Sequence, residues 1–246
     1  MRWQVCYRER PLPYDLDCCM TWTKICGTTN LDDARLAISA GADAVGFVFA
    51  PSRRQIRQET AAEIIEVLPN EIAKIGVTVN QSPDAVARLA ETVGLTWIQL
   101  QGDEPADQLQ AYRSALAPRK IVKTLQARQV LAGGEDYVYR YLGESEFIDA
   151  VLLDAGVPGQ PGGTGVPFDW NALLPFVLRI KQSVPVIIAG GLTADNVPAA
   201  LRLFEPWGVD VVSGVESEPG RKDEVKLRAF VNAVRTASVS QSMASR

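Results

Sequence analysis

Eight short apolar segments, each followed by an amphipathic or mixed segment, most constrain how this chain of 246 residues can fold. The apolar segments are nearly continuous, which is typical of strands buried on both faces of a parallel sheet. They occupy residues 24–26, 44–49, 74–79, 97–100, 121–124, 150–153, 186–189 and 209–213. Clear amphipathic segments occupy residues 32–39, 58–68, 83–93, 106–116, 194–203 and 223–234. Eight such units in one chain of this length predict a single (β/α)8 TIM barrel.

The ends of the chain differ from these repeats. Residues 1–22 mix arginines and prolines without a period and lack the apolar core of a signal peptide, so we expect a disordered extension. Met20, rather than Met1, is a possible start of translation. Residues 238–246 are small and polar and predict a disordered tail, which leaves one domain at residues 23–237. The weakest repeat is 128–146, where Gly133 and Gly134 interrupt any helix.

Composition excludes several classes of function. A net charge of −4 provides no basic surface for nucleic acid, and no apolar stretch is long enough to span a bilayer. All four cysteines lie within the first 26 residues, so we expect a reduced, cytoplasmic protein rather than a disulfide framework. The chain has no histidine, and Cys18 and Cys19 are adjacent, so we expect no metal site.

Two apolar segments end at a reactive side chain. The first leads into Cys26, and the sixth leads into Asp154. In a (β/α)8 barrel the carboxyl ends of the strands surround the active site. Because the chain lacks histidine, a thiol and a carboxyl group at these positions are the candidate acid–base pair. A buried, inert cysteine is the competing interpretation of Cys26.

Glycines follow the last two predicted strands. Gly190 and Gly191 come after the seventh strand, and Ser213, Gly214 and Val215 come after the eighth. Glycines allow backbone N–H groups to approach an anion closely, and phosphate-binding barrels hold phosphate at these two loops. The sequence therefore predicts a phosphate site there, whereas a lone pair of glycines would indicate only a tight turn.

Taken together, these motifs resemble the phosphoribosylanthranilate isomerase family of the tryptophan pathway. The resemblance covers residues 24–234 and rests on an ordered set of motifs: KICG (24–27), AGADAVGF (40–47), GVTVN (76–80), QLQGDE (99–104), LLD (152–154), GGTG (162–165), FDW (168–170), AGGLT (189–193) and DVVSGVES (210–217). Single motifs recur in other phosphate-binding barrels, but the ordered set is specific.

The resemblance implies an Amadori rearrangement of N-(5-phosphoribosyl)anthranilate, without metal or organic cofactor, by a protein that is monomeric in most of the family. By position, Asp154 matches the family's general acid and Cys26 its general base. The acid needs a raised pKa, and the thiol needs a lowered pKa or deprotonation on binding. Lys24, on the same strand face as Cys26, is a candidate to stabilise a thiolate.

Other positions are expected to bind substrate. Arg54 aligns with the family arginine expected to bind the anthranilate carboxylate, but Arg53 replaces a proline there and is an alternative ligand. Gln101 stands where the family usually has histidine, so it hydrogen-bonds but does not titrate. Gly163 lies in a glycine-rich segment, 159–165, that is a candidate lid. Asp103 and Glu104 are expected to cap a helix.

Two alternatives stay open at this stage. One is another phosphosugar barrel enzyme, including one that also accepts a histidine-pathway substrate, although a cysteine and aspartate pair favours the tryptophan substrate. The other is a non-catalytic barrel that binds a phosphosugar. The departures at Arg53 and Gln101 leave this second alternative possible.

Overall fold

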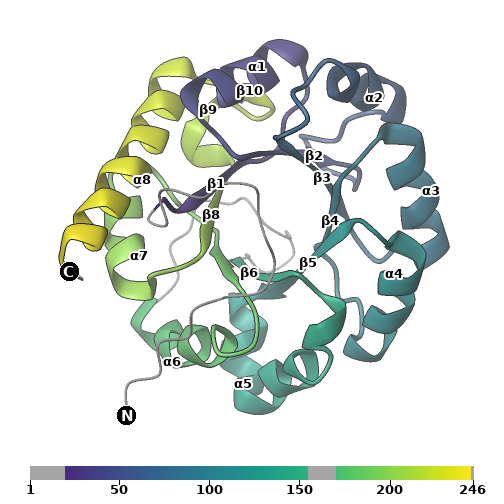
Figure 1. The fold of residues 1–246 in the computed structure, drawn as a ribbon, viewed down its shortest axis with the longest axis vertical. Helices are drawn as coiled ribbons and strands as arrows, with labels where there is room; N and C mark the ends of the chain where they lie inside the picture. The colour runs from purple at the N-terminus through teal and green to yellow at the C-terminus, as the bar shows by residue number, and fades with distance from the viewer. Residues whose placement is uncertain (1–19, 155–169, 245–246) are drawn as a thin grey trace.

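Eight parallel strands close into a barrel in the computed structural model, which describes residues 20–154 and 170–244 (Figure 1). Each strand pairs with its neighbours in chain order, and β1 pairs with β8 to close the sheet. The strands are β1 Trp22–Ile25, β2 Ala44–Val48, β3 Ala73–Thr78, β4 Trp97–Leu100, β5 Lys120–Gln126, β6 Ala150–Asp154, β7 Val186–Ile188 and β8 Gly208–Val211. The predicted fold is confirmed.

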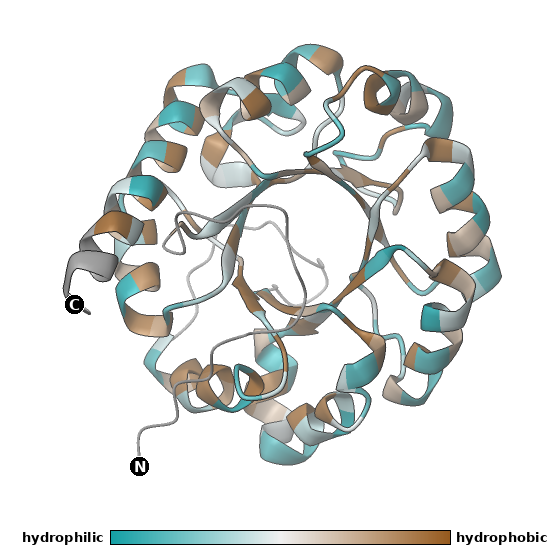
Figure 2. Ribbon diagram, viewed as in Figure 1, coloured by the Kyte–Doolittle hydropathy of each residue, from teal (hydrophilic) through white to brown (hydrophobic). Residues whose placement is uncertain are grey.

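Helices surround the barrel, with hydrophilic residues spread over their outer surfaces (Figure 2). They are α1 Leu31–Ala40, α2 Gln58–Glu66, α3 Pro83–Val93, α4 Leu109–Leu116, α5 Ala127–Leu142, α6 Trp170–Ile180, α7 Val197–Phe204 and α8 Glu224–Ala244. Short 3-10 helices lie at η1 Ala106–Gln108, η2 Ser145–Phe147 and η3 Ser213–Val215, and a two-stranded sheet joins β9 Glu216–Glu218 to β10 Arg221–Lys222. No helix in the described ranges is long and apolar enough to cross a membrane.

Local sequence explains where these helices begin and end. The Asn30 side chain accepts a hydrogen bond from the Asp33 N–H at 2.9 Å and caps α1. Gly41 ends the same helix in the left-handed conformation, at φ 97°. The outward faces of the strands pack beneath the helices, where most of the hydrophobic core lies.

Helix α5 fills the repeat that the sequence marks as weakest. It contains a kink at Gly134, whose φ of 58° and ψ of −149° are non-helical. The predicted interruption is therefore present, although helical turns lie on both sides of it.

The C-terminal end differs from the prediction. Instead of a disordered tail from Ser238, α8 continues to Ala244. Ser238 is 2% exposed, and its hydroxyl lies 2.9 Å from Thr21 Oγ1 and accepts a hydrogen bond from the Thr21 N–H. These hydrogen bonds connect the last helix to the segment before β1 and stabilise the helix at Ser238.

Three stacked indole rings lie inside the amino-terminal end of the barrel. Trp22 begins β1, Trp97 begins β4 and Trp207 precedes β8. Their ring centroids are 4.8 to 6.3 Å apart. Together with a small apolar layer around Leu152 and Ile187, they close this end of the barrel. The opposite end is left for the site.

Candidate active site

Cys26 directly follows β1 and is buried, at 4% exposure. Its N–H donates to the Val211 carbonyl oxygen at 2.9 Å, which fixes it beside the end of β8. Gly46, on the neighbouring strand β2, makes room for the thiol: a Cβ atom there would lie 2.6 Å from Cys26 Sγ. Position 46 must therefore be glycine, because any larger side chain there would collide with the Cys26 thiol.

The pKa of the Cys26 thiol is raised in the folded protein. Burial raises the pKa of Cys26 above its ordinary value, while the ammonium groups of Lys24 and Lys222 act in the opposite direction. The free protein therefore favours the thiol form. A lowered pKa for Cys26, one of the two routes that the sequence analysis allows, is not found.

Lys24 lies fully buried inside the barrel, and its Nζ donates to Asp210 Oδ2 at 3.0 Å and to Gln99 Oε1 at 2.7 Å. Burial lowers its pKa, but Asp210 and Cys26 outweigh that effect and raise the pKa of Lys24 above its ordinary value. The lysine therefore stays charged beside Asp210 and Gln99.

A chain of hydrogen bonds connects this lysine to the candidate acid. Gln99 Nε2 donates to Gln101 Oε1 at 2.5 Å, and Gln101 Nε2 donates to Asp154 Oδ2 at 3.0 Å. Thr124 Oγ1 also donates to Gln101 Oε1. Because Lys24 can only donate, the direction of every amide in the chain is fixed. Gln101 thus holds one oxygen of the Asp154 carboxyl group.

Glu104 does not cap a helix, which corrects the sequence prediction. It is 2% exposed and pairs with the buried Lys123, at 2.6 Å between Oε2 and Nζ. Its Oε1 accepts the N–H groups of Asn80 and Gly102. A buried carboxylate needs such partners, and here they hold the loop that follows Gln101.

Arg54 is held in place by Glu216 rather than left in solvent. Arg54 Nη2 and Nε donate to the Glu216 carboxylate, with a shortest distance of 2.6 Å, and the Arg54 side chain is 13% exposed. Lys222 Nζ joins the same carboxylate at 3.2 Å and donates to the Cys26 carbonyl oxygen at 2.6 Å. Arg53, by contrast, is exposed.

Gly27 allows this arrangement. It adopts a φ of 74°, and a Cβ atom there would lie 2.7 Å from Arg54 Cδ. A glycine after the candidate base therefore serves both a left-handed backbone and the close approach of the arginine.

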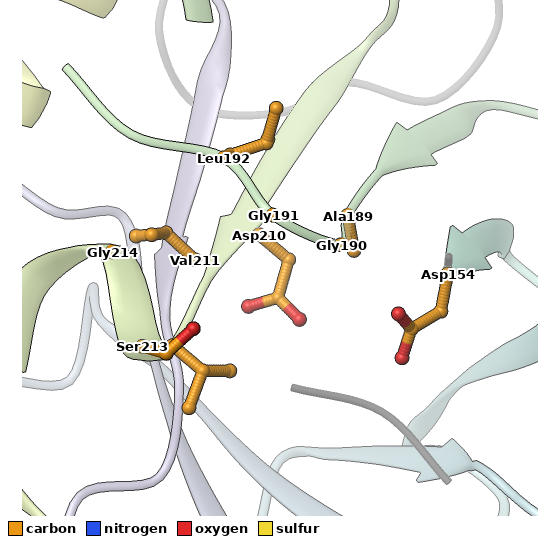
Figure 3. Close-up of a pocket in the computed structure, with 10 residues that line it drawn as sticks. Asp154, Ala189, Gly190, Gly191, Leu192, Asp210, Val211, Ser213 and Gly214 are labelled. Atoms are coloured by element: carbon orange, nitrogen blue, oxygen red, sulfur yellow. The ribbon is translucent and has the colours of Figure 1, made fainter. Parts of the chain in front are cut away.

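The two glycine loops meet at a pocket with about 300 Å³ of empty space, part of it open to solvent. Ala189, Gly190, Gly191 and Leu192 form one side, Val211, Val212, Ser213 and Gly214 form another, and Asp154 and Asp210 complete the wall. In Figure 3 the carboxyl groups of Asp154 and Asp210 extend into the same opening. The pocket therefore combines backbone amides with a candidate acid.

These loops are packed against each other. A Cβ atom at Gly214 would lie 1.9 Å from the Leu192 carbonyl oxygen, so only glycine fits there. Gly190 and Gly191 both have positive φ angles, of 90° and 67°. Val215 comes next in the chain, but its side chain is buried in the core instead of lining the pocket.

Comparison with known proteins now gives a consistent result. The sequence model of a family described as N-(5′-phosphoribosyl)anthranilate (PRA) isomerase matches residues 23–233. A protein of that name from Desulforudis audaxviator is 42% identical over 218 residues, covering 89% of this chain and all of the relative. The chain belongs to this family. One from Pelobacter propionicus is 43% identical over 86% of this chain and 94% of its own length.

Solved structures of PRA isomerases agree with this assignment. The enzyme from Thermotoga maritima has a TM-score of 0.76 and 35% identity, covering 88% of this chain and all of its own. A PRA isomerase bound to reduced 1-(o-carboxyphenylamino)-1-deoxyribulose 5-phosphate has a TM-score of 0.73 at 34% identity. The fold, the isomerase class and the role of the family in tryptophan biosynthesis are thereby established for this chain.

Several residues of the candidate site carry only a weak signal in the sequence, or none. Asp210 belongs to a recognised motif, and its position as the next-to-last residue of β8 is the available signal. Gln99 carried the same signal in β4. Glu216 gave none, because its partner Arg54 is 162 residues away. Gly163 and the candidate lid at 159–165 lie outside the described residues.

Proposed function

We propose that this chain converts N-(5-phosphoribosyl)anthranilate to 1-(2-carboxyphenylamino)-1-deoxyribulose 5-phosphate. The strongest support is the pocket in which Asp154 faces two interlocked glycine loops, with Cys26 at the strand end beside β8. Such a pocket suits a phosphosugar whose phosphate binds backbone amides while its ring meets a carboxyl group. Membership of the PRA isomerase family supports the same substrate.

In this mechanism Asp154 is the general acid. Its carboxyl proton passes to the furanose ring oxygen as the C1–O bond breaks, and the anilino nitrogen lone pair forms the C=N bond of a Schiff base. Gln101 donates to Oδ2, so the proton to be transferred resides on Oδ1. The hydrogen bond orients the carboxyl group for this transfer.

Cys26 is then the general base. Its thiolate removes the proton from C2, the electrons of that C–H bond form a C1=C2 double bond, and the Schiff-base electrons return to nitrogen. The resulting enolamine tautomerises to the ketone. Lys24 and Lys222 favour the thiolate, in opposition to burial. In this proposal the thiol proton leaves to solvent as the substrate binds, and the thiolate forms at that step.

Binding groups surround these two residues. We assign the phosphate to the amides around Gly190, Gly191, Ser213 and Gly214, and we keep Val215 and Gly163 in this set from the family resemblance. Glu216 binds Arg54 through Nε and Nη2, so the edge formed with Nη1 is oriented for the anthranilate carboxylate. Arg53, in the same loop, is the alternative ligand. No metal or cofactor enters this mechanism.

We further propose a cytoplasmic monomer. The cysteines, all within the first 26 residues, support a reducing compartment. The related enzyme of Thermotoga maritima is described as dimeric, with monomers generated from it, so this relative does not support the monomer and the state has to be measured. Light scattering on the purified chain tests the monomer directly, and a mass of twice 26.8 kDa contradicts it.

The reaction is tested by mixing purified protein with freshly prepared phosphoribosylanthranilate and following the loss of anthranilate-type fluorescence. We expect turnover by the wild type and a loss of at least about 10³-fold in kcat for Cys26→Ala and for Asp154→Asn. Circular dichroism of both variants controls for folding. Wild-type turnover that both substitutions leave unchanged contradicts the assigned roles. No wild-type turnover favours a non-catalytic phosphosugar-binding barrel.

A further inference from the structure

Gln126 is a buried side chain beside the candidate acid that the mechanism above does not use. It ends β5, and its Cα pairs in register with that of Asp154 on β6. Thr124, two residues earlier, points into the barrel and donates to Gln101. Because side chains alternate along a strand, Gln126 points to the same side, at the level of Asp154.

The amide of Gln126 is unsatisfied. The residue is 5% exposed, and neither Nε2 nor Oε1 has a hydrogen-bond partner among the residues that the structure describes. Gln126 is also the N-cap of α5, but its side chain makes no capping hydrogen bond. The Gln126 amide therefore neither bonds to a described neighbour nor caps the helix that follows it.

Buried polar groups are nearly always hydrogen-bonded, because a group without a partner loses its interactions with water and gains nothing in exchange. An unsatisfied amide at the carboxyl end of a barrel strand is therefore best explained by a partner that arrives with the substrate. An amide offers one donor and one acceptor group, and a hydroxyl group matches both.

We propose that Gln126 binds a ribose hydroxyl group of the phosphosugar substrate, next to the ring oxygen that Asp154 protonates. This inference rests on the proposed function. It adds a substrate contact at the end of β5, beside Asp154 at the end of β6 and the glycine loops that follow β7 and β8. Gln126 is a binding residue in this account, and it takes no part in proton transfer.

Gln101 provides a matched control. Both glutamines are buried and neighbour Asp154. In Gln101, however, Oε1 accepts hydrogen bonds from Gln99 and Thr124, and Nε2 donates one to Asp154. Replacement by methionine keeps the length of the side chain and removes its polar atoms. The same substitution should therefore have opposite effects on stability at the two positions.

We expect Gln126→Met to raise Tm by about 2–4 °C, because it removes an unsatisfied group. It should raise KM for phosphoribosylanthranilate about tenfold and leave kcat nearly unchanged. The Kd of the reduced product analogue, reduced 1-(o-carboxyphenylamino)-1-deoxyribulose 5-phosphate, should rise by a similar factor. Gln101→Met should instead lower Tm and reduce kcat, because it leaves Asp154 without its donor.

Each other outcome overturns the inference in a different way. A lower Tm for Gln126→Met would mean that the amide has partners within the protein. A higher Tm with unchanged KM and Kd would mean that the amide does not contact substrate. Absence of turnover and of analogue binding by the wild type contradicts the proposed function itself, and with it the assignment of a sugar ligand to Gln126.

Discussion

At the scale of single residues, Cys26 combines burial with two neighbouring ammonium groups. Burial raises the pKa of the thiol, and Lys24 and Lys222 limit the increase without reversing it. Raising the pH through this raised pKa converts thiol to thiolate, so reactivity should increase over the alkaline range instead of reaching a plateau near neutrality.

We therefore predict that the rate of alkylation of Cys26 by iodoacetamide increases with pH beyond the ordinary thiol range. Lys222→Met removes a charge that favours the thiolate and should move this profile to higher pH. Peptide mass spectrometry separates Cys26 from Cys6, Cys18 and Cys19. An alkylation rate that is independent of pH, or a profile that Lys222→Met moves to lower pH, contradicts this account.

The sequence could predict which residues occupy strand ends but not how their side chains pair. Cys26 and Asp154 follow apolar runs, so their location at the carboxyl ends of β1 and β6 could be inferred from local pattern alone. The partner of Arg54 lies 162 residues away on β9, and no local signal encodes it. Glu104 likewise resembled a helix cap until its contact with Lys123 was visible.

At the scale of elements, the kink in α5 depends on a single backbone conformation. The φ of 58° and ψ of −149° at Gly134 lie in a region essentially restricted to glycine. No atom lies within 4 Å of the position that a Cβ would take, so any cost of substitution comes from the backbone and not from a clash. Gly143, at the end of the same helix, has an ordinary helical φ of −61°.

We predict that Gly134→Ala lowers the free energy of unfolding by about 1–3 kcal/mol. Gly143→Ala is the matched control and should be neutral or slightly stabilising, by up to about 1 kcal/mol. Urea denaturation followed by circular dichroism measures both. Equal effects of the two substitutions would show that the kink does not require glycine.

Predicted and observed strands agree closely in position, because each buried strand is a short apolar run with clear boundaries. The tail was mispredicted for a related reason. Serine-rich composition suggested disorder, whereas spacing carried the helical signal: Val231, Val234 and Ser238 fall on one buried face of α8. Reading the period through the polar residues would have extended the helix.

At the scale of the whole molecule, the barrel closes where its first and last elements meet. Strand β1 pairs with β8, and α8 packs against both α1 and α7. Ser238 adds hydrogen bonds from α8 to Thr21, directly before β1. The C-terminal segment therefore contributes to closure and does not merely follow the domain.

We predict that truncation after Ala237 lowers the free energy of unfolding by about 1–3 kcal/mol, because Thr21 loses its buried partner. Truncation after Ser240 keeps Ser238 and should have little effect. Ser238→Ala in the full chain should reproduce much of the loss. Stability that is unchanged by truncation after Ala237 would mean that the barrel is complete without this contact.

The three stacked tryptophans at the amino-terminal end give the molecule an optical consequence. Indole rings separated by 4.8 to 6.3 Å couple their electronic transitions, so Trp22, Trp97 and Trp207 should share an exciton band in near-ultraviolet circular dichroism. The rings come from β1, β4 and the approach to β8, and the coupling of the Trp22–Trp207 pair requires that the first and last strands stay joined. The barrel thus carries its own spectroscopic marker of closure, at the end opposite the candidate site.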